Sequence, residues 1–355
     1  MKKVLVVFGG ASSEHSVSTV SASSVINHIP NEEYEIFMLG ITKNGEWMLF
    51  EGDPNDLPED KWMQSEKCKP AFISPDSAVH GIVICENGNY RTQYIDVVFP
   101  VLHGKNGEDG TIQGLLQLAG IPFVGCDSAS SAICMDKALT NTMADSNGIV
   151  QAKWASLLKS NCTDEALQSI ADKLGYPIFV KPANAGSSVG INKAKDFESL
   201  KEAAKKAFVH DEKVVFEEFI QGSEIECAVL GNNEPVAAVV GEVVPCNEFY
   251  DFDAKYINGT SALHIPARLE QSVQDKVREE AVRTFKALGC SGISRVDFFV
   301  CNGGEKILFN EINTIPGFTS ISMYPKMFEA SGIGYSQLID KILKLAIEKW
   351  SETTN

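Results

Sequence analysis

Apolar residues fall along the chain in two patterns, short continuous runs and segments in which they recur every three to four residues. Continuous runs such as residues 3–8 and 95–102 predict buried strands, and periodic segments such as 16–29 and 111–119 predict helices. Strands that alternate with helices are typical of a parallel sheet with crossover helices. The first part of the chain is therefore expected to be an α/β domain in which residues 51–74 form an irregular loop.

The pattern changes after residue 124 and again near residue 213, which predicts three units with boundaries 1–124, 125–212 and 213–355. The remaining predicted helices are 128–146, 164–174, 197–208, 271–288 and 335–350, and the remaining predicted strands are 34–41, 122–124, 176–181, 213–219, 224–230, 236–244, 294–300 and 306–312. Residues 247–261 follow no period and predict a long loop, a feature that is often functional inside a compact domain.

Composition narrows the class of protein. Hydrophobic residues make up 44% and charged residues 22%, which are ordinary globular values and exclude a disordered or fibrous chain. The net charge of -16 disfavours nucleic acid and anionic membranes as partners. No apolar run suits a membrane span or a signal peptide. Nine cysteines without metal-binding spacing predict reduced thiols and a cytoplasmic location.

The predicted hairpin near the C-terminus carries the sharpest chemical pattern. Residues two apart on a strand share a face, so Arg295 and Asp297 project together, as do Glu311 and Asn313. A three-residue turn centred on Gly303 would place Arg295 opposite Glu311. Carboxylate and amide oxygens suit Mg²⁺ that is bound jointly with phosphates. An exposed polar sheet face with a surface ion pair is the alternative.

A second pattern is a strand that ends at Lys181 and is followed by a glycine and serine loop over residues 186–190. Glycines let backbone N–H groups approach phosphate oxygens, and a lysine neutralises their charge. The loop is not a Walker A motif, and a plain flexible turn explains the same residues.

Two more candidates follow the strands of the first unit. Glu14 comes after Gly9 and Gly10, which lack the spacing of a dinucleotide fold, and it either faces a ligand or complements a helix dipole. His103 ends a buried strand. Both lie at the carboxyl ends of strands, where open α/β sheets bind ligands, although a structural role for each is the alternative.

Taken together, seven blocks in one order resemble the D-alanine:D-alanine ligase family of the ATP-grasp superfamily. The blocks are FGGASSEHSVS, HGKNGEDGTIQG, MDK, FVKPANAGSSVG, FYDFDAKY, SRVDFF and NEINTIPGFTSISMYP. The resemblance implies a three-domain ATP-grasp fold, in which a parallel-sheet N-terminal domain precedes two α+β lobes that sandwich ATP. It also implies a homodimer.

The resemblance implies a site for ATP and metal ions. Residues that match the family's ATP contacts are Lys137, Lys181, Ser188, Glu217, Glu218, Ile220, Glu224 and Lys255. Asp297, Glu311 and Asn313 match the ligands of two Mg²⁺ or Mn²⁺ ions, in agreement with the hairpin pattern. The resemblance leaves open whether a monovalent cation binds in addition to these ions.

For the substrates, the resemblance implies that Glu14 holds the ammonium group of the first amino acid, in a hydrogen-bonded triad with Ser187 and Tyr256. Arg295 and the backbone N–H of Gly317 match the oxyanion site. The pocket of the second amino acid is matched by Ser322 and Met323, and His103 matches a residue near the first carboxylate.

The implied reaction joins two D-alanine molecules at the expense of ATP through an acyl phosphate, for peptidoglycan precursor synthesis. The main alternative is a D-alanine:D-serine ligase, because resistance-type relatives often carry Arg where this chain has Met323. A noncatalytic nucleotide-binding protein is an alternative from another class, and it would keep Arg295 and the metal ligands without chemical purpose.

Overall fold

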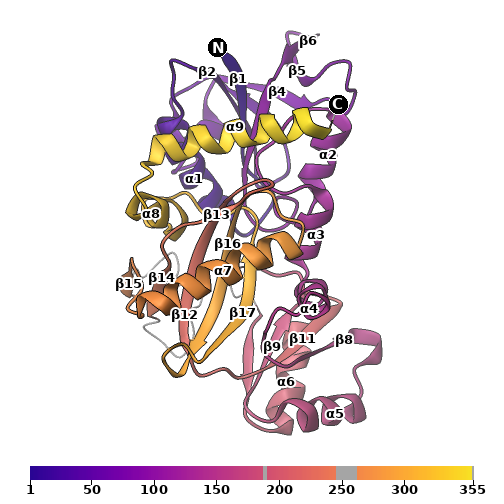
Figure 1. Ribbon diagram of the computed structural model, residues 1–355. Helices are drawn as coiled ribbons and strands as arrows, with labels where there is room; N and C mark the ends of the chain where they lie inside the picture. Colours follow the sequence, from indigo (N-terminus) through magenta and orange to yellow (C-terminus); the bar gives the residue numbers. More distant parts are fainter. Residues whose placement is uncertain (187–189, 245–261, 354–355) are drawn as a thin grey trace.

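The computed structural model describes residues 1–186, 190–244 and 262–353, and its strands form three sheets that follow one another along the molecule (Figure 1). Four of the expected site residues lie outside the described residues: Ser187, Ser188, Lys255 and Tyr256. Among the described helices, none is long and apolar enough to cross a membrane.

The first sheet is parallel only at one end, in the neighbouring strands β2 (Tyr34–Ile41), β1 (Lys2–Gly9) and β7 (Val97–Leu102), of which β7 is the edge strand. Alternate residues of β1 point to opposite faces. Val4, Val6 and Phe8 belong to the core shared with α1 (His15–His28), whereas Leu5 and Val7 belong to the core shared with α2 (Thr111–Ala119). These elements match the expectation closely, and the strand expected at residues 122–124 is reduced to a bridge between Val98 and Phe123.

The expected parallel sheet is present, and it is one part of a mixed first sheet. Four further strands extend it in antiparallel order: β3 (Trp47–Phe50), β4 (Cys68–Ile73), β5 (Gly81–Glu86) and β6 (Asn89–Tyr94). Asn87 and Gly88, both with positive φ, form the two-residue turn between β5 and β6 that is typical of hairpins. The expected loop 51–74 thus contains β4 as well as two short 3₁₀ helices, η1 (Pro54–Asp56) and η2 (Lys61–Gln64).

The second sheet has the order β10-β9-β11-β8. Its strands are β8 (Trp154–Leu158), β9 (Ile178–Pro182), β10 (Asn192–Ala194) and β11 (Lys213–Glu218). Helices α5 (Asp164–Leu174) and α6 (Phe197–Ala207) share a core with this sheet, and the short η3 (Lys159–Asn161) follows β8. Because β11 pairs with both β8 and β9, it belongs here and not to the unit expected to begin at residue 213.

Two helices, α3 (Ser128–Met135) and α4 (Lys137–Ser146), replace the single helix expected over 128–146. Asp136 between them has an extended backbone, and its carboxylate accepts hydrogen bonds from the N–H groups of Ala138 and Leu139. This cap ends the first helix and begins the second at Lys137.

The third sheet has the order β15-β14-β12-β16-β17 within the described residues, with β13 paired to β12. Its strands are β12 (Ser223–Gly231), β13 (Val236–Ala237), β14 (Gly241–Val244), β15 (Ala262–His264), β16 (Gly292–Cys301) and β17 (Lys306–Asn313). The strand expected over 236–244 is therefore split in two. Helix α7 (Gln271–Ala287) packs on this sheet, and η5 (Asn302–Gly304) turns from β16 to β17.

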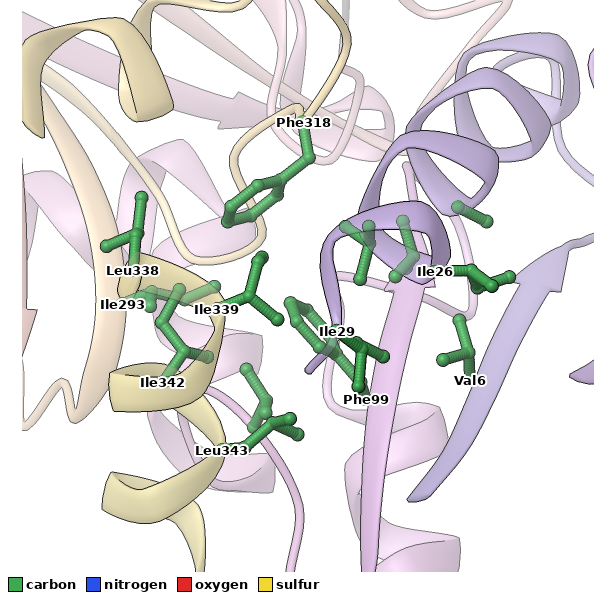
Figure 2. Packing of buried hydrophobic residues seen from close by; sticks show 14 of the residues in the cluster. Val6, Ile26, Ile29, Phe99, Ile293, Phe318, Leu338, Ile339, Ile342 and Leu343 are labelled. Carbon is green, nitrogen blue, oxygen red and sulfur yellow. The ribbon is translucent and has the colours of Figure 1, made fainter. Parts of the chain in front are cut away.

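The last two helices, α8 (Met323–Ala330) and α9 (Tyr335–Thr353), join the third sheet to the first. Leu338, Ile339, Ile342 and Leu343 of α9 lie in one apolar cluster with residues of α1, β1 and β7 and with Ile293 of β16 (Figure 2). Helix α8, whose position the apolar pattern did not predict, lies in the same cluster. The end of the chain thereby holds the first and third sheets in a fixed relation.

Candidate active site

Two adjoining cavities lie where the three sheets meet. The first, of about 260 Å³, is lined by loops of the first sheet, by the start of α4 and by the segment that follows β17. The second, of about 590 Å³, lies between the second and third sheets. Glu226, Arg295 and Glu311 line both cavities and form part of a shared wall. Each expected site residue that the structure describes lines at least one of the two cavities.

Glu14 stands immediately before α1 and its side chain is buried between two glycine loops. A Cβ atom placed on Gly104 would lie 2.4 Å from Oε2 of Glu14, and one placed on Gly186 would lie 3.0 Å from the same atom. Both positions therefore need a glycine so that the backbone can approach the carboxylate. The carboxylate forms part of the first cavity, where it can receive a cationic group.

His103 follows β7 and is also buried at the first cavity. Its Nε2 lies 3.4 Å from Oγ of Ser21, and its Nδ1 lies 3.7 Å from a carboxylate oxygen of Glu108. Glu108 in turn accepts a hydrogen bond of 2.9 Å from the N–H of Gly104. Glu108 was missed by the sequence interpretation, although its position in a glycine-flanked loop after a buried strand was a usable signal.

The two expected lysines occupy different elements. Lys137 is the first residue of α4, and its ammonium group donates a 2.9 Å hydrogen bond to the carbonyl of Ala185. Lys181 lies on β9 and its Nζ is 2.5 Å from a carboxylate oxygen of Glu217. Burial by itself would lower the pKa of Lys181, but the neighbouring carboxylates, Glu217 first, raise that pKa above its usual value. Lys181 is therefore a charged lysine.

The hairpin of β16 and β17 brings the expected acidic residues together, but in a different register. Arg295 is opposite Asn313, and Asp297 is opposite Glu311, so the prediction that Arg295 faces Glu311 is wrong. The turn leaves four residues unpaired instead of three, and a register shift next to Asp297 adds another residue on β17. Since opposite residues share a face, the expected common surface is kept.

Arg295 is held by carboxylates on two strands. Its Nε and one terminal nitrogen donate to the two oxygens of Asp297 at 2.8 and 2.6 Å, and Oε2 of Glu226 on β12 lies 3.2 Å from Nε. Burial would lower the pKa of Arg295, but Asp297 and Glu226 raise that pKa well above its usual range. Glu226 was also missed, although it shares a strand face with the expected Glu224.

The acidic residues fit a divalent cation that arrives with phosphates. Within the described residues no cluster of three His, Cys, Asp or Glu side chains is arranged to hold a metal alone. Five carboxylates nevertheless surround two cations at the second cavity and the shared wall: Glu217, Glu224, Glu226, Asp297 and Glu311 around Lys181 and Arg295. This excess of negative charge admits an anionic triphosphate only together with positive ions, for which hard oxygens are suitable ligands.

The remaining expected ATP contacts line the second cavity beside Lys181: Glu217, Glu218, Ile220 and Glu224. The carboxylate of Glu218 accepts a 2.8 Å hydrogen bond from the backbone N–H of Lys153. This bond ties the end of β11 to the segment before β8. Asn141, which the sequence interpretation missed, lines both cavities and lies 3.5 Å from a Glu217 oxygen.

The segment after β17 contributes Gly317, Ser322 and Met323 to the first cavity. The hydroxyl of Ser322 accepts a 2.9 Å hydrogen bond from the N–H of Thr319, which closes the segment into a tight loop. Met323 begins α8, and its methyl group would be 2.2 Å from a Cβ placed on Gly241. The backbone of this loop and the apolar thioether of Met323 therefore lie side by side at the first cavity.

Comparison with known proteins agrees with this geometry. Residues 3–126 match the description "D-ala D-ala ligase N-terminus" and residues 143–344 match "D-ala D-ala ligase C-terminus". The chain belongs to the D-alanine–D-alanine ligase family. It is 51% identical to a D-alanine–D-alanine ligase of Caldicellulosiruptor bescii, over 98% of this chain and 95% of that relative.

Solved structures of the family have the same fold. A D-Ala:D-Ser ligase from Enterococcus faecalis is 43% identical with a TM-score of 0.90, over 97% of this chain and 99% of that one. A D-alanine–D-alanine ligase from Bacillus anthracis, solved with ATP, is 29% identical with a TM-score of 0.74, over 99% of this chain and all of that one. The fold is accordingly the ATP-grasp type.

Proposed function

We propose that this chain is an ATP-dependent ligase that joins two D-alanine molecules to D-alanyl-D-alanine through an acyl phosphate, for peptidoglycan precursor synthesis. The observation that carries the proposal is the shared wall of Glu226, Arg295 and Glu311, where a lysine-containing cavity suited to a triphosphate meets a cavity that ends at Glu14. Membership of the D-alanine–D-alanine ligase family supports the reaction, and the relative solved with ATP supports the nucleotide.

In this proposal ATP occupies the second cavity. Adenine and ribose lie beside Glu218, Ile220 and Glu224, and the phosphates reach Lys137 and Lys181. Ser188 and Lys255 add phosphate contacts from segments outside the described residues. The tight pair of Lys181 and Glu217 supports this arrangement, because a buried lysine kept charged by carboxylates is ready to neutralise a phosphate.

Asp297, Glu311 and Asn313 would hold two Mg²⁺ or Mn²⁺ ions jointly with the phosphates. When bound, these ions would supply charge neutralisation at the transferring phosphoryl group. The excess of carboxylates at the second cavity supports this part of the proposal. A monovalent cation stays open as an addition.

The first chemical step is activation of a carboxylate. An oxygen of the first D-alanine attacks the γ-phosphorus of ATP, the bond to the β-phosphate oxygen breaks, and ADP leaves. Glu14, with Ser187 and Tyr256, holds the ammonium group of this substrate, and His103 lies near its carboxylate. The burial of Glu14 supports the assignment, since an ion pair is strong where water is excluded.

The second step forms the peptide bond. The neutral amine of the second D-alanine attacks the acyl carbonyl carbon, the bond from that carbon to the phosphate oxygen breaks, and the departing phosphate takes up the proton that the nitrogen loses. Negative charge develops on the carbonyl oxygen, where Arg295 and the N–H of Gly317 stabilise it by about 3 kcal/mol or more. Acyl phosphates hydrolyse in water, so enclosure of the site is part of the same proposal.

The second amino acid decides between two products. Ser322 and Met323 line the first cavity, and an apolar Met323 favours the methyl group of D-alanine over the hydroxyl of D-serine. D-serine is the alternative, because the 43% identical structural neighbour is a D-Ala:D-Ser ligase. One hydroxyl group changes affinity in such a pocket by only about 1–3 kcal/mol, so the product has to be measured.

The test uses the purified full chain with ATP, Mg²⁺ and equal amounts of D-alanine, D-serine and D-lactate. Products are identified by mass spectrometry while phosphate release is followed in parallel. We expect mostly D-alanyl-D-alanine. A mostly mixed product would keep the ligase reaction but reject the assignment of the second pocket, and ATP binding without phosphate release would reject the enzyme.

We further propose that the protein works in the cytoplasm as a homodimer. Its substrates, ATP and free D-alanine, are small molecules of that compartment. The acidic net charge of -16 disfavours polyanions as partners. Light scattering on the purified chain measures the oligomeric state directly, and a mass near that of one chain would reject the dimer.

A further inference from the structure

The loop that carries Gly317 is anchored by its neighbour, Phe318. Phe318 is fully buried, and its ring meets Phe99 of β7 edge-on at 5.8 Å between centroids. The rings of Tyr324 and Tyr335 lie 5.5 and 6.2 Å away. Figure 2 shows Phe318 directed towards the apolar cluster between α9 and α1. The side chain thus fixes one point of the loop against the first sheet.

Both backbone groups of Phe318 are bound as well, by two different helices. Its N–H donates to Oγ of Ser21 on α1 at 3.3 Å, and its carbonyl accepts a 2.7 Å hydrogen bond from the hydroxyl of Tyr335 on α9. The single hydroxyl proton of Tyr335 is used in that bond, so Ser24, 3.0 Å away, donates to the Tyr335 oxygen. Each peptide group of Phe318 therefore has a fixed orientation.

The orientation bears on the reaction because Gly317 directly precedes this anchor. Gly317 lines the first cavity, and a Cβ on it would lie 2.9 Å from Oγ of Ser322, so the backbone at Gly317 packs closely against Ser322. Ser21 also lies 3.4 Å from Nε2 of His103, so one hydroxyl contacts both the loop and the candidate substrate-binding histidine.

We propose that Ser21 and Tyr335 are positioning residues that aim the N–H of Gly317 at the developing oxyanion. The inference rests on the proposed function. Neither residue lines the two cavities, so each acts through Phe318 and not by touching substrate. Burial raises the pKa of Tyr335 to about 12, against a smaller opposing effect of Ser24, so the hydroxyl keeps the proton that it donates at neutral pH.

The first test compares Tyr335→Phe with the matched control Tyr34→Phe. Tyr34 is also a buried tyrosine beside α9, and its hydroxyl donates to Asp340 at 3.0 Å, away from the loop. We expect Tyr335→Phe to lower kcat about 10-fold with the KM for ATP unchanged, because misplacement of a reacting group slows the chemical step. The control should keep kcat within about twofold at a similar loss of stability.

The second test uses Ser21→Ala with Ser23→Ala as its control, a buried serine on the same helix. Ser21→Ala should also lower kcat and leave the KM for ATP unchanged, and the double variant with Tyr335→Phe should lose less than the product of the two single effects, because both act on Phe318. A tetrahedral phosphinate analogue of the dipeptide should bind Tyr335→Phe and Ser21→Ala about 10-fold more weakly. D-alanine binding should be unchanged in Tyr335→Phe, because Ser21, and not Tyr335, contacts His103.

The outcomes separate the two proposals. If the unmodified protein forms no dipeptide, the proposed function fails. If it is active and Tyr335→Phe and Ser21→Ala match their controls in kcat and in analogue binding, the positioning role is rejected. A fall in melting temperature with unchanged kcat would assign both hydroxyls to structure alone.

Discussion

At the level of single residues, carboxylates outnumber lysines and arginines among the described residues that line the two cavities. Arg295 takes both oxygens of Asp297 and also lies against Glu226. Removal of one partner from such a buried group is costly, because the remaining charge has lost its compensation. The negative charge of the carboxylates around Arg295 exceeds its single positive charge. This excess is the reason to expect metal ions with ATP.

Replacement of Asp297 by asparagine tests that expectation. Asp297→Asn should raise the Mg²⁺ concentration needed for half-maximal activity at least about 10-fold, because it removes a charged oxygen ligand. Activity is measured as phosphate release over a range of Mg²⁺ concentrations. The control is Asp275→Asn on α7, where the carboxylate is half-exposed beside Arg278. Equal Mg²⁺ dependence in both variants would remove Asp297 from the metal site.

A second residue-level prediction concerns stability in acid. Arg268 donates to both oxygens of Glu242 at 2.9 and 3.0 Å, and this hydrogen bonding holds the pKa of Glu242 below its usual 4.5. A carboxylate with a lowered folded-state pKa stabilises the fold above its unfolded pKa, and this contribution is lost as the pH falls through the folded value.

Glu242→Gln should consequently lower the free energy of unfolding at pH 7. The difference in this free energy between the variant and the unmodified chain should shrink as the pH falls below about 4.5. Urea unfolding at a series of pH values measures both effects. If this difference stays constant as the pH falls through the folded-state pKa of Glu242, the charge of Glu242 does not stabilise the fold.

At the level of elements, the break between α3 and α4 places a lysine at the cavity. Asp136 caps α4 and also binds Nζ of Lys213 at 2.5 Å, so β11 and the helix start are tied together. Lys137, the next residue, is held by the segment after β9 through the carbonyls of Ala183 and Ala185. The cap thus couples helix stability to the position of a candidate phosphate ligand.

Asp136→Ala should cost about 1–2 kcal/mol of stability, because α4 loses its N-cap. It should also raise the KM for ATP several-fold, because the cap no longer fixes the position of Lys137 at the start of α4. Asp127→Ala is a matched control, since Asp127 caps α3 through the N–H of Ser130 but no lysine follows it. The control should lose about 1 kcal/mol with an unchanged KM. If the KM for ATP is unchanged in both variants, the cap at Asp136 does not contribute to ATP binding.

At the level of the whole molecule, α9 makes the first and third sheets one body. Ile342 is buried in a cluster that contains Val6 of β1 and Leu230 of β12. The second sheet has its own core, which includes Leu200. Stability should therefore be shared between the first and third sheets and partly separate in the second.

Truncation of either core tests this division. Ile342→Ala should cost about 2–5 kcal/mol and speed amide hydrogen exchange in both β1 and β12. Leu200→Ala should cost a similar amount but speed exchange mainly in β9 and β11. Faster exchange confined to one sheet in the Ile342 variant would contradict a shared core.

Local pattern predicted most single elements because strand and helix periods are properties of a few adjacent residues. Helices such as α2 and α5 and the strand β2 have the expected bounds. The antiparallel extension of the first sheet, the break at Asp136 and the assignment of β11 were not predicted. Each depends on a turn, a cap or a pairing partner elsewhere in the chain, which the apolar pattern does not contain.

The sequence by itself determined the family, the candidate site residues and the common face of the hairpin, because ordered motifs and the two-residue strand period are local. Only the tertiary structure decided that Arg295 is opposite Asn313, since the register depends on a shift and a turn length. It also revealed that Ser21 and Tyr335, which are distant in sequence, bind the same residue, Phe318. Long-range packing of α1 and α9 brings them together, and no local pattern encodes that contact.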